Sequence, residues 1–158
     1  MKWCRRTVAS AFVLGILALG CGKEFDPQVV RVANLGLEMS LPEGWRTEQS
    51  DPRLFYEAGK ADDNFGMIED DELAGKSLES YVDEMLAGAF DAAVVSKGAA
   101  TVGGHPAVEA VTEGRYRTIE ITVARDDRAI RIWFRTLPRD FPEQEEAFRQ
   151  ALRSIRFD

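Results

Sequence analysis

The chain has few of the residues from which catalytic and metal sites are most often built. Its 158 residues contain one histidine, His105, and two cysteines, Cys4 and Cys21. Because His105 stands between Gly104 and Pro106, we expect it in a hairpin turn and not as a general base. A zinc site would lack its usual nitrogen and sulfur ligands. The sequence therefore predicts no catalytic residue, no metal site and no cofactor.

Glycine-based and carboxylate-based motifs are missing as well. Gly103-Gly104 lacks the strand-to-helix context of a phosphate-binding loop. Two acidic clusters, residues 62–64 and 69–72, lack the ligand spacing of a calcium loop. We expect both clusters in solvated loops and keep small-ligand or calcium binding as the alternative function. A hydrolase built on paired carboxylates is a less favoured third hypothesis.

The N-terminal segment contains no acidic residue. A positively charged start, with Lys2, Arg5 and Arg6, precedes an apolar core over residues 8–19. This organisation is typical of a signal peptide, which we expect over residues 1–20. A membrane-spanning helix needs about 20 apolar residues, so a retained span is disfavoured. An uncleaved signal anchor is the alternative, and the arginine pair indicates twin-arginine export only weakly.

The segment ends in the pattern that lipoprotein signal peptidase recognises. Leu17-Ala18-Leu19-Gly20 precedes Cys21, and the small Ala18 and Gly20 fit a groove that admits little beside the scissile bond. The thiol of Cys21 would take the diacylglycerol before cleavage, which predicts a palmitate-bearing membrane anchor. Gly22 carries no aspartate retention signal. This favours the outer over the inner membrane in a two-membrane host, facing the periplasm or the surface.

Cleavage before Cys21 would leave a protein of 138 residues whose only cysteine carries lipid. Such a domain has no disulfide, and its stability must come from an ordinary core. Its length suits one domain that buries roughly two thirds of its unfolded surface. We expect a tether over residues 21–28 and a single domain over residues 29–158.

The charge of the expected mature protein is strongly negative. Without Lys2, Arg5 and Arg6 it has 17 basic against 27 acidic side chains, a net charge of −10. Nucleic acid is therefore excluded as an expected partner. All ten basic residues of residues 101–158 are arginines. They favour a solvated mixed-charge surface, with an acidic partner or the acidic half of the same protein as alternatives.

Alternating apolar and polar residues predict strands along most of the domain. In residues 35–41 every second residue is Leu or Met. Short turns at residues 103–104, 113–114 and 126–127 imply antiparallel neighbours. We expect strands over residues 29–32, 35–41, 54–58, 65–69, 94–97, 99–102, 106–112, 116–125 and 129–136.

Two segments repeat apolar residues at helical spacing. Ser77 is a natural N-cap for a helix over residues 78–90. Pro142 can occupy the first position of a second helix, whose apolar side includes Phe148 and Leu152. The order of strands, helix, strands and helix predicts the α+β class, with helices packed on one antiparallel sheet.

Several of these features occur in a recognisable order. Leu41-Pro42-Glu43-Gly44-Trp45 follows an alternating strand, and then come the helix around Tyr81-Val82, the turn at residues 103–107, paired late strands and a closing helix through Phe157. The set resembles the PsbP-like superfamily, which includes PsbP, Mog and DcrB-like proteins, over roughly residues 29–157. The resemblance implies an α/β/α sandwich with a central antiparallel sheet of about six to seven strands. It also implies non-enzymatic accessory or partner-binding work.

Two tryptophans of the expected domain suggest different roles. Trp45 is expected to cover an edge of the core, with ligand stacking as the minority alternative. Trp133 stands between Arg131 and Arg135, on the strand face opposite Ile132 and its apolar neighbours. If exposed, these three residues form a partner-binding surface. The sandwich instead favours covering of Trp133 by a helix.

These observations together predict a lipid-anchored, non-catalytic cell-envelope protein with an accessory or partner-binding domain. Its expected partners are the membrane, through the lipid on Cys21, and an envelope protein that the sequence does not identify.

Overall fold

The computed structural model describes residues 28–89 and 91–158. The predicted signal peptide, Cys21 with its lipidation motif, and most of the tether lie outside these ranges. Within them, no helix has both the length and the apolar character needed to cross a membrane.

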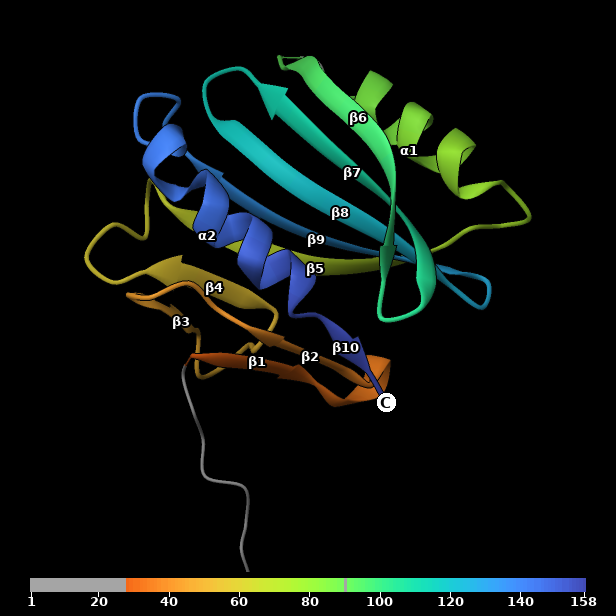
Figure 1. Cartoon of the computed structure of the whole chain (residues 1–158), viewed down its shortest axis with the longest axis horizontal. Helices are drawn as coiled ribbons and strands as arrows, with labels where there is room; N and C mark the ends of the chain where they lie inside the picture. The colour runs from red at the N-terminus through yellow and green to blue at the C-terminus, as the bar shows by residue number, and fades with distance from the viewer. Residues whose placement is uncertain (1–27, 90) are drawn as a thin grey trace, which may run out of the picture.

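A seven-stranded antiparallel sheet forms the centre of the fold (Figure 1). Its strand order is β3-β4-β5-β9-β8-β7-β6. Turns of two or three residues join β6 to β7, β7 to β8 and β8 to β9, so these neighbours pair antiparallel. The strands are β3 (Trp45–Thr47), β4 (Leu54–Glu57), β5 (Phe65–Glu72), β6 (Ala93–Val102), β7 (His105–Glu113), β8 (Arg117–Arg125) and β9 (Arg128–Thr136).

A second, smaller sheet joins the two ends of the described residues. Its order is β1-β2-β10, all antiparallel. The bounds are β1 (Val29–Val32), β2 (Leu37–Ser40) and β10 (Arg156–Phe157), with a 3-10 helix, η1 (Ala33–Leu35), between the first two. In the register of β10 with β2, Phe157 pairs with Leu37.

Two helices lie on opposite faces of the large sheet (Figure 1). α1 (Leu78–Ala87) packs on β7 and β8, and α2 (Phe141–Arg153) packs on β8, β9 and β2. The hydroxyl of Ser77 caps α1 by accepting from the backbone N–H of Ser80 at 3.2 Å. Pro142, predicted at the first position of α2, stands in the first turn, one residue after the first helical residue, Phe141.

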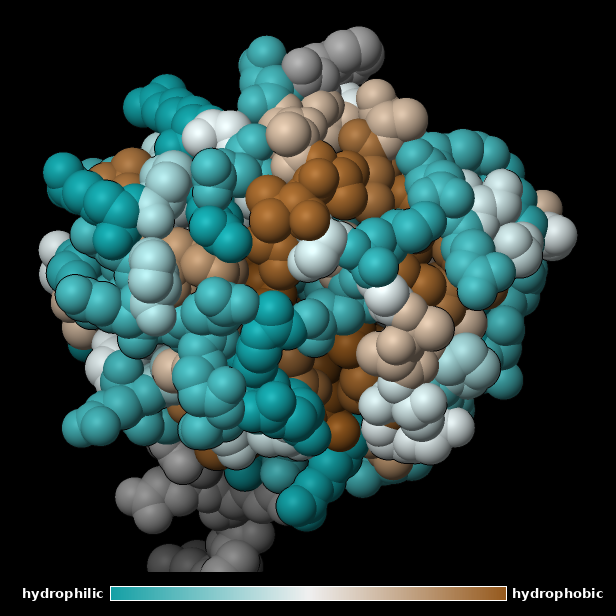
Figure 2. All heavy atoms as spheres, turned by 45° about the horizontal axis from the view of Figure 1, so that its top comes forward, coloured by the Kyte–Doolittle hydropathy of each residue, from teal (hydrophilic) through white to brown (hydrophobic). Residues whose placement is uncertain are grey.

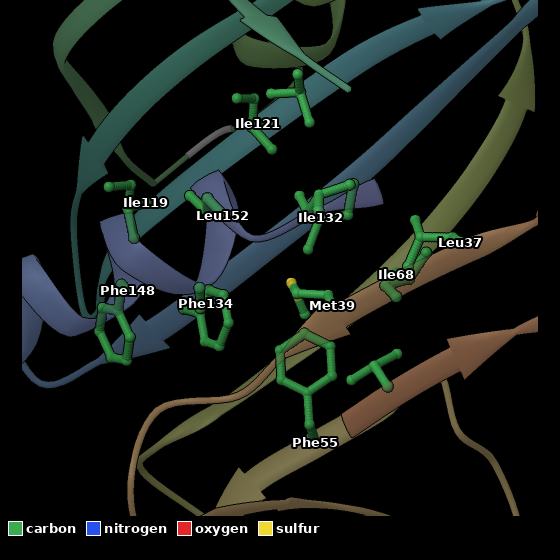
Figure 3. Packing of buried hydrophobic residues seen from close by; sticks show 14 of the residues in the cluster. Leu37, Met39, Phe55, Ile68, Ile119, Ile121, Ile132, Phe134, Phe148 and Leu152 are labelled. Carbon is green, nitrogen blue, oxygen red and sulfur yellow. The ribbon is translucent and has the colours of Figure 1, made fainter. Parts of the chain in front are cut away.

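The main core lies between the large sheet, α2 and the small sheet (Figure 3). Register places apolar side chains of β8 and β9 on the same face, for example Ile119 opposite Phe134 and Ile121 opposite Ile132. Phe148 of α2 stacks on Phe134 with 4.9 Å between ring centroids. Aromatic packing thus holds α2 against the sheet.

Hydrophobic side chains also reach the surface on one side of the molecule. Figure 2 shows them gathered in the middle of this side and framed by hydrophilic residues. Among the described residues, the large hydrophobic side chains that are exposed are Val94 and Val95 of the edge strand β6.

The predicted α+β sandwich is confirmed, and several local predictions differ from the structure, three of them at element ends or breaks. The closing helix, predicted to run through Phe157, ends at Arg153, because β10 leaves the helix to pair with β2. Residues 93–102 form one strand with an irregularity between Val94 and Ser96 rather than two strands. α1 ends at Ala87, before Gly88.

Candidate functional site

The outer face of the large sheet, opposite α2, carries a group of arginines and aromatic rings. Alternation along β9 places Arg131, Trp133 and Arg135 on this face, while Ile132 and Phe134 belong to the core. We define the outer-face cluster as these three residues and their partners, which are Phe65, Glu69, Tyr116 and Glu120.

An ion-pair network occupies one end of the outer-face cluster. Nε of Arg131 donates to Oε2 of Glu120 at 2.8 Å, and Nη1 donates to Oε2 of Glu69 at 2.9 Å. Nη2 of Arg131 also contacts Glu120. Since the three residues come from β9, β8 and β5, one guanidinium links three adjacent strands.

Glu120 is the deeply buried carboxylate of this network, with 2% of the residue exposed. Burial raises the pKa of its carboxyl, and the charge and hydrogen bonds of Arg131 act in the opposite direction. Its Oε1 atom has no hydrogen-bond partner among the described residues. Because Glu120 is enclosed and bound to Arg131, it orients that arginine within the sheet.

Trp133 lies within the outer-face cluster and not on an open surface. It is 8% exposed, and its Nε1 donates to Oε2 of Glu69 at 2.9 Å. Its ring meets Phe65 edge-on with 5.1 Å between centroids. Of the two alternatives for Trp133, the structure has the covered one. A partner-binding role for Arg131, Trp133 and Arg135 stays a prediction, with the tryptophan as support for the two arginines.

The other end of the cluster is a stack of an arginine with aromatic rings. The guanidinium carbon of Arg135 lies 3.8 Å from the ring centroid of Phe65 and 4.3 Å from that of Tyr116. Arg115 lies over the same Tyr116 ring at 5.4 Å. Burial lowers the pKa of Arg135, while Tyr116 acts to raise it and Arg115 to lower it.

A cavity of about 310 Å³ opens between α1 and the network end of the cluster. Tyr81 and Met85 of α1 line it, together with Arg131 and acidic residues of β5. The Tyr81 hydroxyl donates to Oδ2 of Asp71 at 3.3 Å. Burial, and next the negative charge of Asp71, raise the pKa of Tyr81. The phenol therefore stays protonated, as a hydrogen-bond donor.

One predicted acidic cluster, residues 69–72, belongs to strand β5 and not to a solvated loop. Pairing with β9 explains the difference, because it places basic partners beside two of the carboxylates. Arg131 binds Glu69, and Asp70 binds both Arg53 and Arg128. Arginines of the C-terminal half thus meet carboxylates of the acidic half, one of the alternatives that the charge distribution left open.

The other residues singled out from the sequence pack within the fold. Trp45 is 1% exposed and packs edge-on against Phe134 and Phe148, so it is a core residue. His105 begins β7 after the glycine turn, and its ring meets Phe157 at 5.3 Å between centroids. In residues 62–64, Asn64 is buried and accepts from the Thr136 hydroxyl at 2.6 Å.

No cluster of three or more His, Cys, Asp or Glu side chains is placed to hold a metal ion anywhere in residues 28–89 and 91–158. The carboxylates of the outer-face cluster, Glu69 and Glu120, are each bound to Arg131. Carboxylates held by an arginine are poorly suited to proton transfer. The arrangement is better suited to binding through arginine and aromatic groups.

Sequence reasoning missed Glu120, Phe65 and Tyr116 as members of the cluster. A weak signal existed for Glu120, since the alternation of β8 puts it on the face opposite Ile119 and Ile121. Its contact with Arg131 depends on strand register, which the sequence did not define.

Comparison with known proteins identifies the fold. No protein-family model and no curated protein matches the sequence. The solution structure of a cyanobacterial PsbP from Synechocystis is 13% identical, with a TM-score of 0.62, and the match covers 89% of this protein and 99% of that one. LpqN of Mycobacterium tuberculosis, described as involved in cell envelope biogenesis, is 15% identical with a TM-score of 0.62, covering 76% and 82%.

A mutant of the protein Mog1 is a third similar structure. It is 10% identical with a TM-score of 0.54, covering 84% of this protein and 96% of that one. At such identities the likeness establishes the fold alone. The resemblance inferred from the sequence is confirmed at that level, since the protein has a PsbP/Mog-like fold.

Proposed function

We propose that this protein is a lipid-anchored, non-catalytic protein of the cell envelope whose domain binds a protein partner. Two independent observations support the two parts of the proposal. The lipidation motif supports the location, and the outer-face cluster supports partner binding.

The location rests on Leu17-Ala18-Leu19-Gly20 before Cys21, at the end of a basic and then apolar segment. LpqN, which shares the fold, is described as involved in cell envelope biogenesis. That description belongs to LpqN, and here it supports an envelope location for this protein.

Partner binding rests on one observation, which is the gathering of arginines and aromatic rings on the rigid strands of the outer face. Arg131 and Arg135 lie over aromatic rings of the cluster at 5.7 Å and 3.8 Å from the ring centroids. Tryptophan, tyrosine and arginine are the residue types that dominate binding energy at protein interfaces. Strands hold them in fixed positions, which lowers the entropic cost of binding.

The anchor is tested by metabolic labelling of the full-length protein with an alkyne analogue of palmitate in a bacterium with two membranes. We expect label in the wild-type protein and none after Cys21→Ser. Cys4→Ser is the matched control, since Cys4 lies in the segment that cleavage removes. Equal labelling of the Cys21→Ser protein would contradict the anchor.

The partner is tested by crosslinking in living cells followed by mass spectrometry. We expect a reproducible envelope protein with the wild-type protein that is lost with Cys21→Ser and kept with Cys4→Ser. If lipidated, well-expressed protein yields no crosslinked partner, partner binding is contradicted in favour of small-ligand binding.

A further inference from the structure

Arg131 and Arg135 lie on the same face of the same strand, yet their partners differ. Arg131 binds the carboxylates of Glu69 and Glu120. Arg135 forms no ion pair and no hydrogen bond through its side chain within the described residues. In the sheet register its neighbours are Phe65 on β5 and Thr118 on β8, so no carboxylate stands beside it.

Two rings flank the Arg135 guanidinium, Phe65 at 3.8 Å and Tyr116 at 4.3 Å from the ring centroids. Stacking of this kind uses the faces of a guanidinium and leaves its N–H groups without an acceptor. The Nε atom of Arg135 is buried without a hydrogen-bond partner among the described residues. The terminal Nη groups are not among these buried atoms and form no hydrogen bond within the described residues, so they are the donors that an oxygen acceptor can reach.

A cavity of about 250 Å³ adjoins Arg135 and offers room for such an acceptor. Apolar and hydroxyl-bearing side chains form much of its wall, together with Tyr116, Arg115 and one carboxylate, that of Asp91. Asp91 pairs with neither arginine. The cavity therefore places two positive charges and one negative charge beside a partly apolar wall, and this net positive lining suits an anion with a small apolar body.

The form of the anion follows from the arginine geometry. A guanidinium edge presents two parallel N–H groups, which match the two oxygens of a carboxylate. Burial disfavours the charged form of Arg135 and lowers its pKa, and the positive charge of Arg115 lowers that pKa further. A negatively charged ligand beside Arg135 would stabilise the charged form.

We propose that this pocket binds a carboxylate of the protein partner, from an acidic residue or from a free carboxyl terminus. The proposal rests on the proposed partner-binding function and names the group that the partner supplies. Arg135 holds the carboxylate through its terminal Nη groups, and Arg115 adds a second positive charge to the lining.

The test titrates the full-length protein in detergent with benzoate, with its neutral analogue benzamide, and with inorganic phosphate. Binding is followed through the arginine Nε–Hε resonances. We expect a saturable shift of the Arg135 resonance with benzoate, none with benzamide, and at least roughly tenfold weaker binding of phosphate. Absence of a shift, equal shifts with benzamide, or tighter binding of phosphate would each overturn the proposal.

Variants distinguish the contribution of the paired guanidinium N–H groups from that of positive charge alone. Arg135→Lys keeps the charge and should weaken benzoate binding by roughly tenfold or more. Arg115→Gln, on an exposed residue, should weaken it by roughly threefold. The matched control is Arg46→Lys, because Arg46 also stacks on a ring, Tyr56 at 5.5 Å, and forms no ion pair among the described residues. Unchanged benzoate binding by Arg135→Lys would overturn the assignment.

Two further probes distinguish the carboxylate source. N-acetyl-phenylalanine offers a terminal carboxylate, and N-acetyl-glutamate amide offers the carboxylate of an acidic residue. Binding of either supports the pocket and identifies its source, whereas binding of neither overturns it. If benzoate binds but no crosslinked partner exists, the proposed function fails, and the pocket stands as a carboxylate site without a protein partner. If the partner binds Arg135→Lys as well as wild type, the pocket proposal fails alone.

Discussion

Glu120 and Glu57 are both shielded glutamates with hydrogen-bond partners, yet their surroundings shift the pKa in opposite directions. For Glu120, burial is the largest effect and the pKa is raised. For Glu57, burial alone would raise the pKa, but hydrogen bonds from Asn64, Gln144 and Lys60 outweigh it, and the pKa is lowered. Glu120 therefore contributes to stability at low pH, and Glu57 contributes at higher pH.

Glu120→Gln should alter the pH dependence of stability. A raised pKa in the folded state means that the contribution of Glu120 is fully present below the ordinary glutamate pKa of 4.5 and is lost as pH rises through the folded value. The free energy of unfolding of wild type, minus that of Glu120→Gln, should therefore fall as pH rises. Urea unfolding of both proteins from about pH 4 to about pH 8 measures this difference in unfolding free energy.

Glu57→Gln is the control of opposite sign. Its lowered pKa gives stability that is present above 4.5 and is lost as pH falls through the folded value. The same difference in unfolding free energy should therefore rise with pH in the acidic range. Equal slopes for the two variants would contradict the environments described for Glu57 and Glu120.

At the scale of elements, the close packing of β5 between β4 and β9 depends on a glycine of β5. Gly66 pairs with Phe55 on β4 and with Phe134 on β9. A Cβ at this position would overlap the Phe55 ring and the backbone oxygen of Trp133. Because one of these atoms is backbone, the strands themselves would have to move.

Gly66→Ala should therefore destabilise the fold by about 1–3 kcal/mol through overpacking. Gly98→Ala is the matched control, since Gly98 also lies in a strand and a Cβ there meets nothing within 4 Å. Its effect should stay within about 0.5 kcal/mol. Chemical unfolding of both variants makes the comparison, and equal effects would be inconsistent with the close packing at Gly66.

The elements that the sequence predicted are those defined by local signals. β7 to β9 follow from alternation and from tight turns such as Gly103-Gly104, whose φ values of 55° and 83° suit glycine. β10 was missed because Phe157 pairs with Leu37, from the opposite end of the described residues. The cluster partners of Arg135, Phe65 and Tyr116, were missed because non-local register carries no local sequence signal.

For the whole molecule, the net charge and the ion pairs of the arginines determine whether the domain binds a membrane surface. Residues 22–158 contain 17 basic and 27 acidic side chains, a net charge of −10. Several arginines are tied to carboxylates of the same domain, including Arg128, Arg131 and Arg149. Five arginines form no ion pair among the described residues. Arg115 and Arg135 line one cavity, whereas Arg46, Arg125 and Arg156 stand on three other strands, β3, β8 and β10.

A protein made of residues 22–158 should therefore show no binding to vesicles that contain phosphatidylglycerol, even at low ionic strength, because its net charge repels an anionic surface. Vesicles with a cationic lipid are the positive control and should bind it, with the binding lost on adding salt. Co-sedimentation measures both. Salt-sensitive binding to the anionic vesicles would mean that the arginines form one continuous exposed surface. The proposed lipid on Cys21 would then share membrane attachment with the domain.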